Sequence, residues 1–231
     1  MKSVLKQLLF NRGIVKNGLV LWLEGEDFFN SPPTTTWGDR SGNRNNATPS
    51  GMAYTTSSGS DGVGGVVFDG VDDNAAITFP TNTFDNGITS SIVYKTSLLP
   101  SELAASTFMR LLWEVNDNFS LYYNQTTANA IVKFGTTEGA AIRPSIAQSY
   151  LFKDRYMEIT VVYNLTTKLL SVYLNGILKN YVTRDGTSPI FSNPFYVSST
   201  VGVLNGDVKS VKFYNRALTN SEIRQNYNAS R

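Results

Sequence analysis

Hydrophobic and polar residues alternate most regularly in the last third of the chain. Two runs rich in β-branched and aromatic residues, 158–164 and 169–175, flank a short polar turn. The pair Asn175-Gly176 then turns the chain into a third run, residues 177–182. Because Asn-Gly readily adopts the positive φ angles of a type I′ turn, this pattern predicts a three-stranded antiparallel meander.

The middle run of this meander has one clearly apolar face. Leu170, Val172 and Leu174 share that face, whereas Ser171 and Tyr173 share the other. The apolar face suits a core, and the mixed face could meet either solvent or a second layer. We therefore expect a β-sheet protein built outward from this meander.

The rest of the chain shows short apolar runs between segments rich in Gly, Asn, Ser and Thr. They occupy residues 18–24, 65–70, 74–79, 89–96, 108–115, 119–124, 130–134, 196–199 and 208–214. Many short strands separated by turns are typical of a sandwich or jelly roll. Since no repeat and no proline- or glycine-rich linker divides the chain, the sequence predicts one all-β domain, a sandwich or jelly roll over residues 18–231.

A short helix is expected at the carboxyl end. Thr219 followed three residues later by Glu222 forms a capping box, in which each side chain satisfies a backbone amide of the other residue. Ile223 and Tyr227 are four residues apart, so both can pack onto the sheet.

The first seventeen residues are predicted to form an N-terminal arm. They carry four basic residues, and no acidic residue occurs before Glu24. Their apolar side chains fall near one helical face and are our candidates for docking on a partner: Val4, Leu5, Leu8, Leu9 and Phe10.

The arm is expected to be neither a signal peptide nor a membrane span. Lys6 and Gln7 interrupt the apolar run, and no small-residue cleavage site follows it. The run is also too short to cross a bilayer. Two alternatives stay open: the arm packs on its own domain, or it docks on a neighbouring subunit.

Composition narrows the classes of function. The chain has 231 residues, 41% hydrophobic and 16% charged, and a formal net charge of +2. This charge is too small to argue for nucleic acid as the main partner. The absence of Cys and His removes disulfides, thiolate zinc sites and Ser-His catalysis.

Several segments resemble the laminin-G-like jelly roll of the concanavalin A-like lectin and glucanase superfamily. They are residues 18–23 with 37–48, residues 67–73, and residues 211–223, in the family's order. The resemblance implies two antiparallel sheets packed face to face and a short helix near the carboxyl end. Its members include calcium-dependent sugar binders, adhesion modules and glucanases, so the fold alone does not choose a function.

We expect no catalysis. The glucanases of this superfamily carry a Glu-x-Asp-x-x-Glu pattern on one strand, because glycoside hydrolysis uses two carboxylates across the scissile bond. The chain lacks this pattern. Glu114 and Asp117 instead flank a predicted hairpin turn.

A calcium site is a second candidate feature. Asp39, Asp69, Asp72 and Asp73 are carboxylates in loops that the family tends to bring to one rim. Calcium takes six to eight such oxygens. The competing interpretation, which we favour, is that these aspartates accept hydrogen bonds from nearby backbone amides in turns.

A sugar site is the third candidate. Tyr122 and Asn124 fall on one face of a predicted strand, and Arg110 lies on the neighbouring run, where alternation places Leu112 and Glu114 on the same face. Sugar binding uses aromatic faces with nearby amide and carboxylate groups. The alternative is a merely solvated sheet face.

Taken together, these features favour a non-catalytic virion protein, a capsid or tail accessory subunit of a bacteriophage. The resemblance allows this role, because jelly rolls of this type occur on phage particles. The arm would dock on other virion proteins or on copies of the same chain, and weak glycan adhesion is compatible with it. The alternative is a calcium-dependent carbohydrate-binding adhesin or receptor-binding module.

Overall fold

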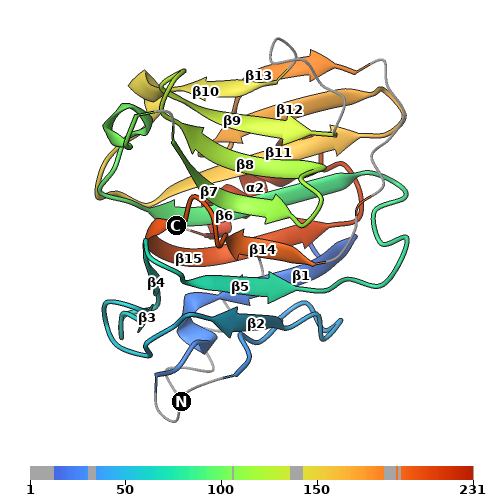
Figure 1. Ribbon diagram of the computed structural model, residues 1–231. Coiled ribbons are helices and arrows are strands. Elements are labelled where there is room, and N and C mark those ends of the chain that lie inside the picture. Colours follow the sequence, from blue (N-terminus) through green and yellow to red (C-terminus); the bar gives the residue numbers. More distant parts are fainter. Residues whose placement is uncertain are drawn as a thin grey trace.

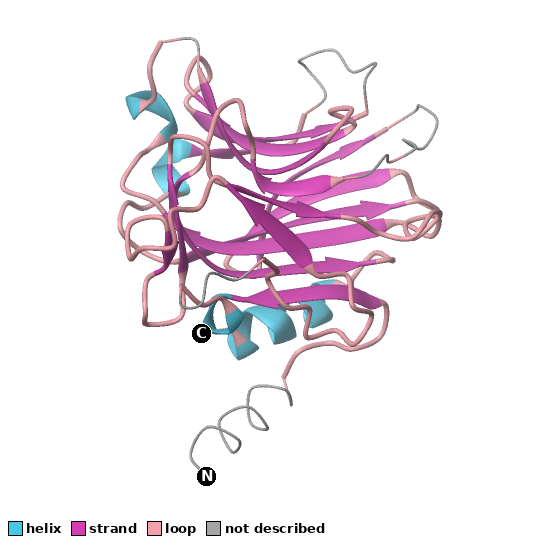
Figure 2. Cartoon of the chain, turned by 60° about the horizontal axis from the view of Figure 1, so that its bottom comes forward, coloured by secondary structure: helices cyan, strands magenta, loops and turns pink. Residues whose placement is uncertain are grey.

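The computed structural model describes residues 13–30, 35–105, 107–135, 143–184, 191 and 194–230. Two antiparallel sheets pack face to face, with the seven-stranded sheet in front in Figure 1. Strands make up most of the regular structure, and the longest helix follows the last strand (Figure 2). The predicted two-sheet sandwich with a carboxyl-terminal helix is confirmed.

The eight-stranded sheet contains the longest of the described strands, β15, which pairs with three other strands. In order across the sheet, the strands are β13 (Ile177–Thr183), β12 (Leu169–Leu174), β11 (Met157–Asn164), β6 (Ile88–Lys95), β15 (Asn205–Tyr214), β4 (Val66–Asp69) and β3 (Gly59–Ser60). The eighth strand, β1 (Leu19–Glu24), also pairs with β15. Residues 205–208 of β15 pair with β4 and residues 210–214 pair with β1, so these two strands lie end to end beside it.

The meander is present but lies at the edge of this sheet. Strands β11, β12 and β13 pair in sequence order, and Asn175 and Gly176 have φ angles of 51° and 74°. These are the positive values that a type I′ turn requires. The expectation that the sheet is built outward from the meander is wrong, because the meander forms one end of the strand order and β6 lies at its middle.

The seven-stranded sheet contains the remaining strands. Its order is β10 (Ser145–Ala147), β9 (Asn129–Phe134), β8 (Phe119–Asn124), β7 (Phe108–Glu114), β14 (Phe195–Ser198), β5 (Asn74–Ile77) and β2 (Ala47–Ser50). Short 3₁₀ turns occur at η1 (Gly25–Asp27), η2 (Pro100–Glu102) and η4 (Gln148–Tyr150).

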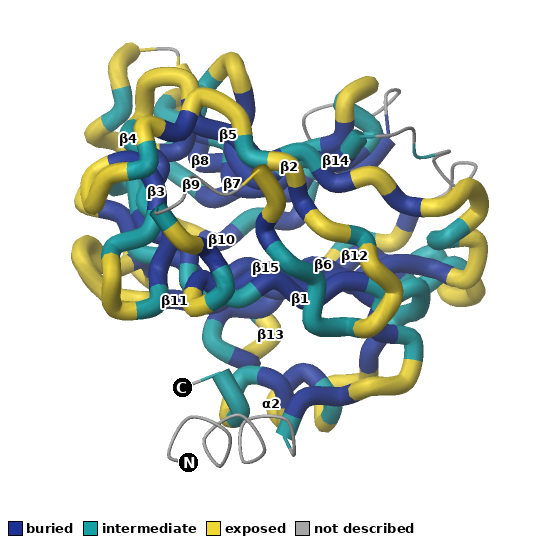
Figure 3. Tube along the Cα trace, turned by 90° about the horizontal axis from the view of Figure 1, so that it is seen from below, coloured by how far each residue is buried: buried dark blue, intermediate teal, exposed yellow. Residues whose placement is uncertain are grey.

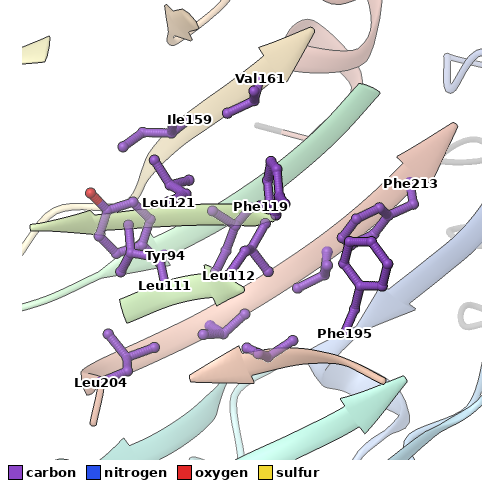
Figure 4. Packing of buried hydrophobic residues seen from close by; sticks show 14 of the residues in the cluster. Tyr94, Leu111, Leu112, Phe119, Leu121, Ile159, Val161, Phe195, Leu204 and Phe213 are labelled. Atoms are coloured by element: carbon purple, nitrogen blue, oxygen red, sulfur yellow. The ribbon is translucent and has the colours of Figure 1, made fainter. Parts of the chain in front are cut away.

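The main core fills the space between the sheets (Figure 4). Phe195 of β14 and Phe213 of β15 meet across the two layers, with ring centroids 5.5 Å apart. Tyr94 of β6 and Tyr123 of β8 bring their hydroxyl groups within 2.6 Å. This hydrogen bond satisfies two polar groups that burial would otherwise penalise.

A second apolar cluster covers the outer face of the eight-stranded sheet. Helix α2 (Asn220–Ala229) lies beneath this sheet in Figure 3. Trp22 and Tyr173 of the sheet pack in one cluster with Ile223 of α2 and with Ile14 and Val15. Of the two alternatives for the mixed face of β12, the structure therefore shows the second layer. The predicted Thr219–Glu222 capping box starts the helix.

Asn226 links α2, the amino-terminal segment and β15. Its side-chain oxygen accepts from the Val15 amide at 2.9 Å, and its amide donates to the Tyr214 hydroxyl at 2.9 Å. Tyr214 in turn donates to the Val15 carbonyl at 3.1 Å. Residues 13–17 of the predicted arm thus pack on the domain of their own chain.

The rest of the arm, residues 1–12, lies outside the described residues. This includes every candidate docking residue: Val4, Leu5, Leu8, Leu9 and Phe10. The division between arm and domain stays a prediction for these residues. Among the described helices, none is long and apolar enough to cross a membrane.

Replacing Asn226 by alanine should lower the free energy of unfolding by about 1–3 kcal/mol, because the Val15 amide and the Tyr214 hydroxyl lose a buried partner. Urea denaturation followed by tryptophan fluorescence measures this. Asn228→Ala, at an exposed position of the same helix, is the control and should change stability by no more than about 0.5 kcal/mol. Equal effects of the two substitutions would contradict the role of Asn226.

Candidate functional site

The outer face of the seven-stranded sheet is hollowed over β7, β8 and β9. The hollow has a volume of about 160 Å³. Its lining combines aromatic, cationic, carboxylate and neutral polar side chains: Phe108, Arg110, Asp117, Ser120, Tyr122, Asn124, Lys133 and Arg143.

The alternation of β8 places its polar side chains in this hollow. Ser120, Tyr122 and Asn124 point outward, whereas the residues between them belong to the main core. Arg110 of β7 is directly opposite Tyr122 in the register. The three residues that the sequence suggested for a sugar, Arg110, Tyr122 and Asn124, therefore line one hollow.

A β-bulge changes which residues of β7 share the outer face. The register with β8 shifts between Arg110 and Leu112, and both Leu111 and Leu112 point into the core (Figure 4). The expectation that Arg110, Leu112 and Glu114 share one face is wrong, because the bulge inserts an extra residue into the strand. Leu112 and Glu114 are buried, and Trp113 takes the outward position.

Aromatic rings surround the guanidinium of Arg110. Its central carbon lies 4.8 Å from the ring centroid of Phe108 and 4.5 Å from that of Trp113. Trp113 in turn stacks on Tyr196 of β14, with centroids 5.2 Å apart and ring planes 21° apart. Phe108 also meets Tyr122 edge to face. The outer face therefore carries an aromatic strip beside the hollow.

Hydrogen bonds to the segment that follows β14 hold Arg110 in this position. Its guanidinium donates to the Ser199 hydroxyl at 3.2 Å and to the Val201 carbonyl at 3.3 Å. Burial lowers the pKa of Arg110, and the nearby Asp117 carboxylate opposes this effect. The side chain stays charged, because the ordinary pKa of arginine lies above 12.

The other charged groups of the hollow fall into one pair and one separate cation. Asp117 forms an ion pair with Lys133 and lies 3.9 Å from Arg110. Arg143, just before β10, donates to the Tyr122 hydroxyl at 2.9 Å.

Several polar atoms of this face have no hydrogen-bond partner among the described residues. They are the Ser120 hydroxyl, the Arg143 Nε and the Trp113 indole nitrogen. Ser120 is only 1% exposed and lies between Trp113 and Lys133 across the strands. Buried polar groups are usually paired, so unpaired ones in a hollow are suited to bind a ligand or water.

Sequence reasoning missed part of this site for identifiable reasons. Ser120 follows from the same alternation that gave Tyr122, and could have been found. Trp113 was hidden by the bulge. Tyr196 and Arg143 come from distant segments, and only the strand order of the sheet brings them near.

The acidic residues of the β4–β5 turn form a separate cluster. Carboxylate oxygens of Asp69, Asp72 and Asp73 lie within 4.8 Å of one another. Asp73 accepts from the Asp69 amide at 2.9 Å and from the Ser58 hydroxyl at 3.1 Å. Burial raises the pKa of Asp73, and the neighbouring carboxylates add to this effect.

Asp39, the fourth candidate metal ligand, is not part of this cluster. Its carboxylate accepts from the backbone amides of Trp22, Ser41 and Asn45, at 2.8–3.0 Å. These bonds hold its loop against β1, which is the turn role that we favoured. Asp69, Asp72 and Asp73 could together hold a cation, but they supply fewer side chains than the six to eight oxygens of calcium, so backbone groups and water would have to complete the shell.

If these aspartates act as turn acceptors, calcium should not change the melting temperature of the protein. A ligand that binds only the folded state raises this temperature, so melting in calcium and in chelator compares the two interpretations. Asp73→Asn should lower stability equally in both buffers, because Asn keeps only one acceptor oxygen. A calcium-dependent rise in melting temperature that Asp72→Asn abolishes would show a metal site.

The fold of this chain is similar to that of several solved structures, and its sequence matches one protein family. Among curated proteins, none matches the sequence. Of solved structures, a Trypanosoma rangeli sialidase in complex with sialic acid is similar over 91% of this chain and 32% of the sialidase, with 21% identity and a TM-score of 0.61. The binding domain of botulinum neurotoxin DC in complex with SialylT is similar over 94% of this chain and 52% of that chain, with 12% identity and a TM-score of 0.62. The binding domain of botulinum neurotoxin serotype D is similar over 93% of this chain and 52% of that chain, with 13% identity and a TM-score of 0.66.

The chain thus spans about a third of the sialidase and about half of the toxin binding domains. At these identities the likeness concerns the fold alone. Residues 69–224, more than half of the chain, match the Laminin_G_3 family. The first resembling segments, residues 18–23 and 37–48, lie before the matched range. The chain therefore belongs to the concanavalin A-like lectin/glucanases superfamily.

Proposed function

We propose that this protein is a carbohydrate-binding module whose ligand surface is the hollow on the outer face of the seven-stranded sheet. The observation that carries the proposal is the grouping of aromatic rings and polar groups around this hollow. An outward sheet face that only meets solvent needs no such grouping. Ligand sites typically combine apolar and aromatic walls with a few convergent polar groups.

The chemistry of the hollow suits a sugar. A pyranose ring has an apolar C–H face, which can pack on Tyr122 or on the Trp113–Tyr196 stack. Its hydroxyl groups can pair with the Ser120 hydroxyl and the Asn124 amide group. The Asn124 carbonyl oxygen already accepts from the Thr127 amide, which leaves the amide nitrogen as the donor that this residue offers.

The superfamily supports this proposal at the level of the fold. Its description includes lectins, and two of the similar structures are complexes with sialic acid and with SialylT. Those ligands belong to the proteins named there. For this chain, the argument rests on its own side chains, because a shared fold does not by itself transfer a function.

The proposed module binds its glycan without cleaving it. In the part of the chain that the structure describes, Asp117 supplies the carboxylate that lines the hollow, and it is paired with Lys133. Glycoside hydrolysis commonly uses two carboxylates, one on each side of the scissile bond. Glycans recovered from the protein after long incubation should therefore have unchanged masses, which mass spectrometry can check.

Substitution of the aromatic residues should weaken glycan binding. A glycan panel first selects a bound sugar, and titration calorimetry then compares the variants. Tyr122→Ala and Trp113→Ala should each lower the affinity about tenfold, since a central aromatic contact contributes more than about 1 kcal/mol. Tyr181→Ala, a 58% exposed tyrosine on β13 of the other sheet, is the matched control.

The same titration, repeated with a chelator, tests the calcium-dependent adhesin that the sequence left as an alternative. The hollow lies on β7–β9, and the cluster of three aspartates lies in the β4–β5 turn. Binding should therefore be unaffected by chelator. Unchanged binding by both aromatic variants, together with loss of binding in chelator, would move the site to the acidic turn.

The role of a phage virion subunit remains a prediction beside this proposal, as does location in a virion. It depends on docking by residues 1–12, which lie outside the described residues. Glycan binding and particle attachment are compatible, because they use different parts of the chain.

Deletion of residues 1–12 should leave the domain folded. Residues 13–17 keep their contacts with α2 and β15, among them the hydrogen bond from the Val15 amide to Asn226. If the arm docks on copies of this chain, full-length protein should sediment as an oligomer and the deletion variant as a monomer. Loss of the cooperative thermal transition on deletion would show that the arm belongs to the core.

A further inference from the structure

We infer that the hollow binds a sugar that carries a carboxylate group, with Arg143 and Arg110 as the cationic groups that select it. This inference rests on the proposed function and names the class of its ligand.

The charges of the hollow are unbalanced. Among the described residues, three cationic side chains line it, Arg110, Lys133 and Arg143, and one carboxylate, that of Asp117. The whole chain has a formal net charge of only +2, so this local excess does not follow from a generally basic surface. An excess of one sign within a small hollow attracts a ligand of the opposite sign.

The carboxylate of Asp117 is already assigned to one of these cations. It forms an ion pair with Lys133, whose side chain is 18% exposed. Its distance to the Arg110 guanidinium is 3.9 Å, which is too long for a hydrogen bond. One carboxylate cannot neutralise both Lys133 and Arg110, and Arg143 takes part in neither of these contacts, so a ligand acid can still neutralise positive charge in the hollow.

Unpaired donors occur where such a ligand would lie. Arg143 donates one guanidinium N–H to Tyr122, but its Nε is buried and has no partner among the described residues. The Ser120 hydroxyl, two residues before Tyr122 on β8, is also buried and has no partner among the described residues. A guanidinium edge and a hydroxyl group can together bind a carboxylate, because the two N–H groups of one edge match its two oxygens.

The surrounding surface favours an acid that is part of a sugar. The walls are aromatic, with Phe108 and Tyr122 meeting edge to face at a centroid distance of 6.1 Å. A volume of about 160 Å³ lies below the roughly 300–1,000 Å³ of sites for drug-sized ligands, so it admits one sugar unit. The stack of Trp113 on Tyr196 offers an apolar platform beside it for the next unit of the chain.

Paired glycans that differ in the acid test this inference: sialyllactose against lactose, and a methyl glucuronide against the methyl glucoside. The acidic member of at least one pair should bind about tenfold more tightly or better, the gain expected from a charge-assisted hydrogen bond. Its affinity should fall as salt is raised, whereas the affinity of the neutral member should not.

Arg143→Gln should remove most of the roughly tenfold preference for the acidic glycan over its neutral partner. Glutamine can still donate to the Tyr122 hydroxyl, and unchanged melting temperature shows that the fold is kept. Arg155→Gln is the control, since this exposed arginine lies outside the hollow, over the ring of Phe152. The control should keep the full preference.

The outcomes separate the two proposals. Equal binding of acidic and neutral sugars would overturn the carboxylate assignment and leave the carbohydrate-binding function standing. A preference that Arg143→Gln does not reduce would place the acid elsewhere and also overturn the assignment. Failure of every acidic and neutral glycan to bind would overturn both the assignment and the proposed function.

Discussion

Strand β15 pairs along its length with three other strands, and the arrangement of the whole sandwich depends on this pairing. One edge of β15 is hydrogen-bonded to β6, while β4 and β1 share the other edge end to end. Backbone groups in a buried strand need such partners, because an unpaired amide or carbonyl there costs as much as a lost hydrogen bond. Strand β15, the last along the chain, therefore joins β1 and β4 to β6 in one sheet.

The two outer faces of the sandwich differ as a result. The last strand leads directly into α2, which folds back over the eight-stranded sheet and covers Trp22 and Tyr173 together with residues 13–17. Trp22 and Tyr173 on that face are therefore buried by packing within the chain. On the other sheet, Trp113, Tyr196 and Tyr122 lie on the outer face and are not part of either apolar cluster among the described residues. Trp113 and Tyr196 on this face are thus available to a ligand, whereas Trp22 and Tyr173 on the opposite face stabilise the fold.

The features that could be predicted from the sequence are those governed by neighbouring residues. The Asn175-Gly176 turn, the Thr219–Glu222 capping box and the alternation along β8 each depend on a few adjacent positions, and all are present. The pairing of β15 with three strands and the stacking of Trp113 on Tyr196 depend on strand order, which local patterns do not contain. The bulge in β7 belongs to a third kind, because one extra residue reverses the facing of every later side chain of the strand. This is why Arg110 and Tyr122 could be placed together from the pattern, while Glu114 was placed on the wrong face.

The anchoring of Arg110 has a consequence for any binding event on this face. Its guanidinium is fixed by Ser199 and Val201, and it lies between the rings of Phe108 and Trp113. A long side chain that is free in solution loses conformational entropy when a ligand immobilises it, and this loss subtracts from the affinity. Here the loss is incurred during folding, since contacts within the chain already hold the side chain in one rotamer. The folded protein therefore presents a cation whose ordering no longer weakens association.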